Sequence, residues 1–248
     1  MAPGAPAWLQ RVTHPRRTPL GDPLLSVVMP AYNERDTIDE IVRRVLAVPL
    51  RIELVVVDDG STDGTRECLV DLQRELGFKL LLQPKNAGKG AAVRAGFAQV
   101  SGDIVIIQDA DLEYSPEEYP DLIELIRSGR ADVVYGSRFL GRHRVFLFNH
   151  YLGNRLLTLL TNVLYNTMLT DMETCFKAMR RDVLQSMTLR SNRFGIEPEL
   201  TAKIFKRGYR VYEIPVTYDG RGYDDGKKIT WRDGLVALWV LLKYRFME

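Results

Sequence analysis

From Leu24 onward, short runs of β-branched and aliphatic residues alternate with segments whose apolar residues recur at helical spacing. This alternation is typical of a mostly parallel sheet that helices cover. The predicted strands span 25–29, 53–57, 79–82, 103–107 and 132–135. Between the first two strands, apolar residues at 38, 41, 42, 45 and 46 give the segment one inward helical face. The sequence therefore predicts an α/β fold that begins with a βαβ unit.

The second half of the chain carries longer helical segments. We expect an apolar-striped helix within 149–169, a helix near 197–206, a strand within 209–216 and a final helix at 230–245. The segment 218–228 is rich in glycine and charge and lacks an apolar period, so it predicts a mobile loop. Because 248 residues can bury one large core, we expect a single domain over 24–248.

Composition excludes several classes of protein. The net charge of +2 is too small to indicate a nucleic-acid-binding protein. The two cysteines, Cys68 and Cys175, cannot supply a disulfide framework or a four-thiolate zinc site, and they fit a reducing compartment. The longest apolar run, 235–242, is too short to span a bilayer. We therefore expect a cytoplasmic protein that binds no nucleic acid.

Charge is divided unevenly along the chain. Residues 1–140 carry 16 Lys and Arg against 21 Asp and Glu, whereas residues 141–248 carry 18 against 11. This asymmetry predicts that the two halves meet different partners. Residues 1–23 hold five of the 12 prolines and three arginines but no apolar signal-peptide core. We interpret them as a mobile, solvated tail in preference to a basic arm that touches a membrane.

Polar motifs follow each of the five predicted strands. In an open parallel sheet, ligands bind beyond the carboxyl ends of the strands, so these motifs should meet at one edge. They are Pro-Ala-Tyr-Asn-Glu at 30–34, Asp-Asp-Gly-Ser at 58–61, Asn-Ala-Gly-Lys-Gly at 86–90, Asp-Ala-Asp at 109–111 and Gly-Ser-Arg at 136–138. This edge is therefore the predicted binding site.

Asp109 and Asp111 suggest a metal site. In extended backbone, residues i and i+2 point the same way, so both carboxylates can face one hard cation, while Ala110 leaves room for a ligand. Mg²⁺ or Mn²⁺ keeps few protein carboxylates and completes its shell with water and phosphate oxygens, so a diphosphate ligand is expected. An isolated pair of this kind more often caps a turn, but the four neighbouring loops favour a metal site.

The other loops offer contacts for a nucleotide. Tyr32 has a ring face for base stacking, and Glu34 has a carboxylate for a ribose. One aspartate of the pair at 58–59 is placed to accept a hydrogen bond from a base N–H or a ribose hydroxyl. Lys89 is equally a diphosphate contact or a solvated lysine. The glycines around it are assigned to close packing and a tight turn, because the segment fits neither the dinucleotide nor the P-loop pattern.

Together the five motifs resemble those of the inverting family 2 glycosyltransferases, especially the dolichyl- and polyprenyl-phosphate mannose or glucose synthases, over residues 24–215. The resemblance implies a GT-A fold, with a Rossmann-like sheet and helices on both of its faces. It also implies a nucleotide-diphosphate sugar donor and Mg²⁺ or Mn²⁺ at Asp109, Asp111 and Glu113. By the same resemblance, Asp59 would meet the base or ribose, and Arg138 the acceptor phosphate or donor diphosphate. The expected nucleotide-sugar contacts are Pro30, Ala31, Tyr32, Glu34, Asp58, Asp59, Lys89, Ala110 and Asp111, and the expected catalytic residues are Asp109, Asp111 and Arg138.

The expected acceptor is a polyprenyl monophosphate. A phosphate monoester with a second pKa near ~6 is mostly dianionic at neutral pH, so its glycosylation needs positive charge and no base. The candidate cations are Arg138, Arg221, Lys227 and Lys228. Glycines at 220, 222 and 226 would let their loop close over a donor. We interpret 24–140 as the nucleotide-sugar and metal half, and 141–248 as the half that faces the acceptor and the membrane.

Two segments are candidates for contact with a membrane surface. Residues 142–148 and 235–245 set bulky apolar side chains beside cations, which is the composition of an interfacial anchor. Burial against the sheet or in a dimer contact is equally open for both. We expect a peripheral protein at the cytosolic face of a membrane, and we leave open a second copy or a membrane subunit as partner.

The sequence leaves two alternative functions open. The same donor chemistry on a soluble saccharide or another hydroxyl acceptor predicts activity without lipid, and a non-catalytic nucleotide-sugar-binding subunit predicts donor binding without turnover. A sugar nucleotidyltransferase is disfavoured because it needs a Gly-rich loop after the first strand, and 30–34 contains no glycine. Glu197 and Glu199, near a predicted helix start, either point toward the acceptor or cap that helix.

Overall fold

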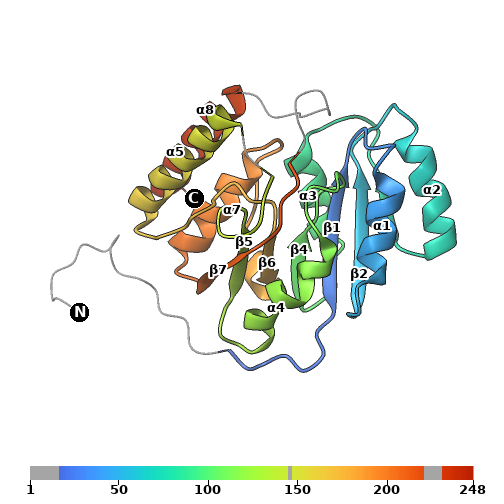
Figure 1. Cartoon of the computed structure of the whole chain (residues 1–248), viewed down its shortest axis with the longest axis horizontal. Helices are drawn as coiled ribbons and strands as arrows, with labels where there is room; N and C mark the ends of the chain where they lie inside the picture. The colour runs from blue at the N-terminus through green and yellow to red at the C-terminus, as the bar shows by residue number, and fades with distance from the viewer. Residues whose placement is uncertain (1–16, 145–146, 221–230, 248) are drawn as a thin grey trace.

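A seven-stranded, mostly parallel sheet organises the computed structural model, with helices packed on both of its faces (Figure 1). The structure describes residues 17–144, 147–220 and 231–247. The strand order is β3-β2-β1-β4-β6-β5-β7, and β6 runs antiparallel to both of its neighbours. The strands are β1 (Leu25–Ala31), β2 (Ile52–Asp58), β3 (Lys79–Leu82), β4 (Ile104–Ile107), β5 (Val133–Ser137), β6 (Lys177–Arg180) and β7 (Val211–Pro215).

The helices follow the predicted pattern, with differences at their ends. They are α1 (Ile38–Ala47), α2 (Thr65–Leu76), α3 (Lys89–Phe97), α4 (Tyr119–Arg127), α5 (Phe148–Tyr165), α6 (Arg181–Gln185), α7 (Ile196–Lys206) and α8 (Trp231–Phe246), with a 3₁₀ turn at Pro116–Glu118. The inward face of α1 is formed by Ile38, Ile41, Val42 and Val45, which are fully buried as the spacing predicts. The expected α/β architecture is therefore confirmed.

The core lies along β1, β4 and β5, whose aliphatic residues are buried on both faces of the sheet. Helix α3 packs very closely on two of the strands at Gly96. A Cβ atom at this position would collide with the side chain of Val28 in β1 and press on that of Val57 in β2. The glycine therefore sets the distance between α3 and the sheet.

Loop 191–193 explains two further glycines, Gly88 and Gly90. A Cβ atom at either position would collide with the backbone of that loop, and Gly88 has a φ of +98°. The assignment of these glycines to close packing and a tight turn is thereby confirmed.

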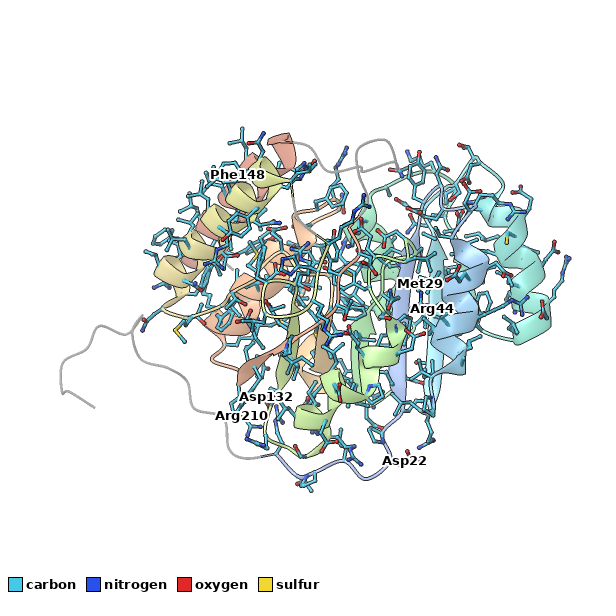
Figure 2. The ribbon with its side chains drawn as sticks, in the orientation of Figure 1. Asp22, Met29, Arg44, Asp132, Phe148 and Arg210 are labelled. Carbon is cyan, nitrogen blue, oxygen red and sulfur yellow. The ribbon has the colours of Figure 1, made fainter. Side chains whose placement is uncertain are left out.

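The segment 17–23, part of the expected tail, is attached to the domain. Arg17 donates a hydrogen bond of 3.0 Å to the buried carboxylate of Asp132, and the Leu20 N–H donates to the Arg127 carbonyl at 2.8 Å. Arg210 pairs with the same aspartate at the amino end of β5, where Figure 2 labels both residues. These contacts correct the expectation of a free tail for 17–23, and the rest of the tail, 1–16, lies outside the described residues.

Helices α5 and α8 lie side by side at one end of the molecule (Figure 1), where the Tyr165 hydroxyl donates to the Leu241 carbonyl at 2.7 Å. The outer sides of both helices expose apolar residues to solvent. One of them, Phe148, is the first residue of α5 and is labelled in Figure 2. We call this surface the α5–α8 face, and its exposed residues are Phe148, Leu152, Leu156, Leu159, Val163, Leu235, Val236 and Trp239. Within the ranges that the structure describes, no helix has the length and hydropathy to cross a membrane.

Candidate active site at the carboxyl ends of the strands

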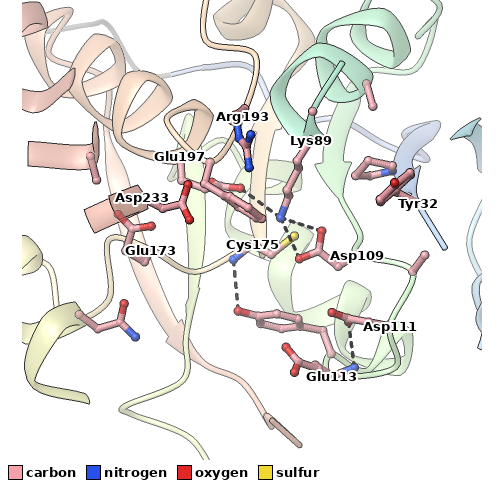
Figure 3. A pocket seen from close by; sticks show the side chains of 18 of the residues that line it. Tyr32, Lys89, Asp109, Asp111, Glu113, Glu173, Cys175, Arg193, Glu197 and Asp233 are labelled. Carbon is pink, nitrogen blue, oxygen red and sulfur yellow. Dashed lines mark hydrogen bonds and ion pairs between the residues drawn. The ribbon is translucent and has the colours of Figure 1, made fainter. Parts of the chain in front are cut away.

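A cavity of about 910 Å³ opens where the carboxyl ends of the parallel strands meet (Figure 3). All five predicted loops contribute to its lining. Tyr32 comes from the end of β1, Asp59 follows β2, Lys89 begins α3, Asp109 follows β4 and Arg138 follows β5. The predicted convergence of the five loops on one edge is therefore present.

Most of the predicted site residues line this cavity. They are Pro30, Ala31, Tyr32, Glu34, Asp59, Lys89, Asp109, Ala110, Asp111, Glu113 and Arg138. The predicted cations Arg221, Lys227 and Lys228 lie outside the described residues.

Asp58 does not line the cavity and is fully buried. Its Oδ2 accepts a hydrogen bond of 2.8 Å from Arg66 Nε, and its Oδ1 accepts one of 3.2 Å from the Ser61 N–H. Asp58 therefore holds the turn after β2, and this placement corrects its predicted contact with the nucleotide.

The neighbouring Asp59 faces the cavity and also fixes the loop before α3. Its two carboxylate oxygens accept hydrogen bonds of 2.8 Å from the backbone N–H groups of Ala87 and Gly88. Each oxygen keeps a second lone pair for a ligand. The structure thus separates the aspartate pair into a buried residue and a cavity residue.

Lys89 is part of a charge network on the cavity wall. Its Nζ lies 2.7 Å from Asp109 Oδ1 and 3.7 Å from Glu197 Oε1, and Figure 3 draws both contacts. Although burial alone lowers the pKa of Lys89, Asp109 and Glu197 hold that pKa well above its ordinary value. Lys89 is therefore charged and paired, which corrects the alternative of a solvated lysine.

The expected metal ligands supply only part of the oxygen shell that a hard cation requires. Asp109 and Asp111 both line the cavity, while Glu113 Oε2 accepts a hydrogen bond of 2.8 Å from the Tyr218 hydroxyl. Over 17–144, 147–220 and 231–247, no group of three or more His, Cys, Asp or Glu side chains is placed to hold a metal ion. The donor set fits Mg²⁺ or Mn²⁺ held by one or two carboxylates and completed by phosphate oxygens, and it does not fit a closed protein site.

One of the cavity loops stores backbone strain at Leu112. Leu112 has a φ of 61°, in the left-handed region that residues with a bulky side chain seldom adopt, whereas Asn33, with a φ of 53°, is of a type that adopts this region more readily. Such conformations cost on the order of 1–3 kcal/mol each and gather at functional sites. The turn at Leu112 directly follows Asp111, so the strain lies beside the expected metal ligands.

Arg138 lines the cavity and forms a buried ion pair. Its Nε and Nη2 each donate a hydrogen bond of 2.7 Å to Asp171, whose carboxylate is fully buried. The guanidinium also lies 5.2 Å from the centroid of the Tyr218 ring. Arg138 therefore forms a buried salt bridge and also lines the cavity.

Glu173 is a cavity residue that the sequence did not predict, and the place of Glu197 was left undecided. Glu197 begins α7 and lines the cavity, whereas Glu199 is fully buried and accepts hydrogen bonds from the N–H groups of Arg190 and Ser191. Glu173 precedes β6 and lines the cavity as well. Because β6 is antiparallel, its amino end lies at the edge where parallel strands have their carboxyl ends. A search restricted to residues that follow strands therefore could not find it.

Burial raises the pKa of Glu173 from 4.5 to about 7, with Lys177 opposing the shift and Glu197 adding to it. The folded protein thus favours the protonated form of Glu173. The contribution of this group to the free energy of unfolding is fully present below pH 4.5 and is lost as the pH rises through 7. The loss amounts to about 3 kcal/mol at most. We predict that Glu173→Gln, which stays neutral, is more stable than the parent at pH 8 but not at pH 4. Urea unfolding at both pH values measures this difference, and equal differences at the two pH values would contradict it.

Known proteins match this chain in sequence over most of its length. The model of the family described as glycosyl transferase family 2 matches residues 26–188. A dolichol-phosphate mannosyltransferase from Pyrococcus furiosus is 32% identical over 209 residues, which cover 82% of this chain and 58% of that protein. An undecaprenyl-phosphate 4-deoxy-4-formamido-L-arabinose transferase from Salmonella paratyphi A is 34% identical, with 82% and 62% covered. The chain thus spans about three fifths of the length of these curated relatives.

Solved structures share the fold. Glucosyl-3-phosphoglycerate synthase from Mycobacterium tuberculosis, in complex with Mn²⁺, UDP and glucosyl-3-phosphoglycerate, aligns with a TM-score of 0.71 at 23% identity, covering 91% of this chain and 81% of that one. The same enzyme in complex with Mg²⁺ and UDP aligns with a TM-score of 0.71 at 24% identity, covering 91% and 80%. At this identity the likeness concerns the fold alone.

Proposed function

The chain belongs to glycosyl transferase family 2, and from this premise we propose that it transfers a hexose from a GDP- or UDP-sugar to a polyprenyl monophosphate, inverting the configuration at C1. One observation carries the proposal: the cavity that gathers the five strand-end loops is closed on another side by α5 and α8, whose outer sides form the apolar α5–α8 face. The same two helices would thus line the donor site on one side and present a lipid-facing surface on the other.

The nucleotide would bind on the side of the cavity formed by β1 and β2. Tyr32 offers its ring to the base, and Asp59 offers a carboxylate that is already oriented by the backbone of 87–88. The diphosphate would lie by Asp109 and Asp111, with the ammonium of Lys89 beside them. When bound, Mg²⁺ or Mn²⁺ at these carboxylates supplies positive charge against the departing nucleoside diphosphate.

The acceptor needs placement and charge compensation but no base, because a phosphate monoester is already ionised at neutral pH. Arg138 lies at the cavity wall in a geometry that Asp171 fixes through two hydrogen bonds. Fixed donors in a site from which water is excluded stabilise developing charge more strongly than mobile ones. Arg138 would therefore position the acceptor phosphate without having to reorganise.

The α5–α8 face supports an acceptor that stays at a membrane surface. Helix α5 places His150 and Asn154 in the cavity lining and exposes Leu156 and Val163 on its outer side. Lys243 and Arg245 follow near the end of α8, so cations flank the apolar residues. Apolar side chains flanked by cations are typical of helices that lie in the interface of an anionic membrane.

The proposal is tested in two steps. Thermal-shift measurements with Mn²⁺ and GDP-mannose, UDP-glucose, UDP-GlcNAc or UDP-glucuronate should identify one donor that raises the melting temperature by mass action. Transfer from that donor should then require a polyprenyl phosphate in vesicles. Transfer to a soluble saccharide without lipid would instead support a hydroxyl acceptor, and donor binding without any turnover would support a binding subunit.

The same assay tests the surface. Leu156→Glu together with Val163→Glu should lower transfer to vesicle-borne polyprenyl phosphate at least tenfold and leave the donor-induced thermal shift unchanged, because these exposed residues lie outside the cavity lining. Leu82→Glu is the matched control, since Leu82 is exposed on the edge strand β3 at the other end of the sheet. Equal transfer by the control and the double variant would contradict a role for the face.

A further inference from the structure

Two cavity residues carry buried carboxylate oxygens without a hydrogen-bond partner. In the described parts of the chain, six buried side-chain atoms lack such a partner, and only Glu173 Oε1 and Glu197 Oε1 belong to residues that line the cavity. Buried polar atoms in folded proteins are nearly always hydrogen-bonded, so an unpartnered pair in a binding site indicates a ligand that donates hydrogen bonds. We infer that Glu173 and Glu197 form the subsite that binds the hydroxyl groups of the transferred hexose, an inference that rests on the proposed function.

Glu197 is anchored through one of its two carboxylate oxygens. Its Oε2 accepts a hydrogen bond of 2.5 Å from Lys177 Nζ, and Lys177 is fully buried. Its Oε1 lies 3.7 Å from Lys89 Nζ, which is beyond hydrogen-bond distance. Glu197 itself is 4% exposed, and Figure 3 shows its carboxylate directed at Lys89 within the cavity. One oxygen is therefore fixed by the protein and the other is left for a ligand.

The backbone around Glu173 is held on both sides. The Met172 N–H donates to Thr158 Oγ1 at 3.2 Å, Thr174 Oγ1 donates to the Gly136 carbonyl at 2.6 Å, and the Cys175 N–H donates to the Tyr114 hydroxyl at 3.2 Å. Glu173 is thus presented to the cavity from a rigid segment. Such support from neighbouring residues is what a selective binding group requires.

The charges around Glu173 suit a neutral, hydroxyl-rich ligand. Lys177 and Arg138 lower its pKa, Glu197 and Asp171 raise it, and burial outweighs them, so that both protonation states are populated near pH 7. A carboxyl group in this condition can accept a hydrogen bond from a hydroxyl or donate one to it. A sugar hydroxyl has both capacities as well.

The position of the two carboxylates matches the far end of a nucleotide sugar. In Figure 3, Glu173 lies on the side of the cavity opposite Tyr32 and Asp111, with Lys89 and Asp109 between them. A donor whose base lies at Tyr32 and whose diphosphate lies at Asp109 would therefore extend its hexose toward Glu197 and Glu173. Adjacent hexose hydroxyls donate hydrogen bonds, and carboxylate oxygens are strong acceptors for them.

The test compares a nucleotide sugar with its own nucleoside diphosphate, using the donor that gives the largest thermal shift. Calorimetric titration with Mn²⁺ should show that the wild-type protein binds the nucleotide sugar about tenfold more tightly than the diphosphate, because the hexose adds hydrogen bonds to charged groups. Glu173→Leu and Glu197→Gln should each remove most of this preference and leave the affinity for the diphosphate unchanged. Glu173→Gln should restore part of it, since the amide also bonds to hydroxyls and the change at 173, unlike that at 197, breaks no ion pair with Lys177.

Glu199→Gln is the matched control, because Glu199 is a buried carboxylate on the same helix that does not line the cavity. It should keep the tenfold preference. The inference would be overturned if the wild type bound the nucleotide sugar and the diphosphate with equal affinity. It would also be overturned if Glu173→Leu and Glu197→Gln kept the full preference, lost affinity for both ligands equally, or lost turnover without any change in binding. A wild-type protein that binds none of the four nucleotide sugars would instead overturn the proposed function itself.

Discussion

Asp111→Ala should lower sugar transfer at saturating Mn²⁺ by about 10²–10³-fold, the loss that follows when one group that stabilises developing charge is removed. Asp111 is the cleaner choice of the two aspartates, because Asp109 is also the ion-pair partner of Lys89 at 2.7 Å. Removal of Asp109 would release that lysine as well as any metal. The measurement is the initial rate at several Mn²⁺ concentrations, with the binding of the nucleoside diphosphate followed in parallel.

Asp71→Ala is the control for this variant, since Asp71 is an aspartate with a 77% exposed side chain on α2. It should leave both rate and binding unchanged. The affinity of Asp111→Ala for the nucleoside diphosphate should lose its dependence on Mn²⁺. Turnover at the wild-type rate at saturating Mn²⁺ would refute the assignment of Asp111 as a metal ligand.

Breaking the buried ion pair between Arg138 and Asp171 should have the largest effect on stability. Removing one partner leaves a buried charge uncompensated, which costs about 3–5 kcal/mol of the free energy of unfolding. We expect this loss for Arg138→Met and for Asp171→Leu, and a much smaller loss for the double variant, which buries no charge. Chemical unfolding of the four proteins gives the coupling energy directly.

The double variant also separates stability from function. If Arg138 positions the acceptor phosphate, this protein should fold and bind the donor but transfer sugar at least tenfold more slowly, with the loss mainly in KM for the acceptor. Arg74→Met is the control, because its pair with Asp71 is exposed and contributes less than about 1 kcal/mol. A double variant with the parental KM would assign Arg138 to the fold alone.

The sequence predicted the first half of the fold well because each aliphatic run there forms a parallel strand, and those of β1, β2 and β4 are largely buried. β3 matches its predicted bounds, 79–82, and β1 extends two residues past the predicted 25–29. The rule that ligands bind at the carboxyl ends of parallel strands then placed Tyr32 and Asp109 correctly at one edge. These predictions succeed because a strand and the loop that follows it can both be recognised from a short stretch of sequence.

What could not be predicted depends on pairing between distant segments. No local signal distinguishes Asp58, which pairs with Arg66, from Asp59, which faces the cavity. β6 was not predicted as a strand, because its Lys177 interrupts the apolar run, and the charge is compensated by Glu197 on a later helix. Its antiparallel insertion between β4 and β5 brings Glu173 to the cavity, and that topology is a property of the whole sheet.

The contact at Gly96 links the core of the protein to its chemistry. A methyl group there would collide with the side chain of Val28 and push α3 away from β1 and β2. Because a helix tends to shift as a rigid unit, this displacement would also move its first residue, Lys89, whose Nζ lies 2.7 Å from Asp109 Oδ1 in the cavity. The position of Lys89 in the candidate site would thus depend on a glycine that packs against two valines, two helical turns farther along α3.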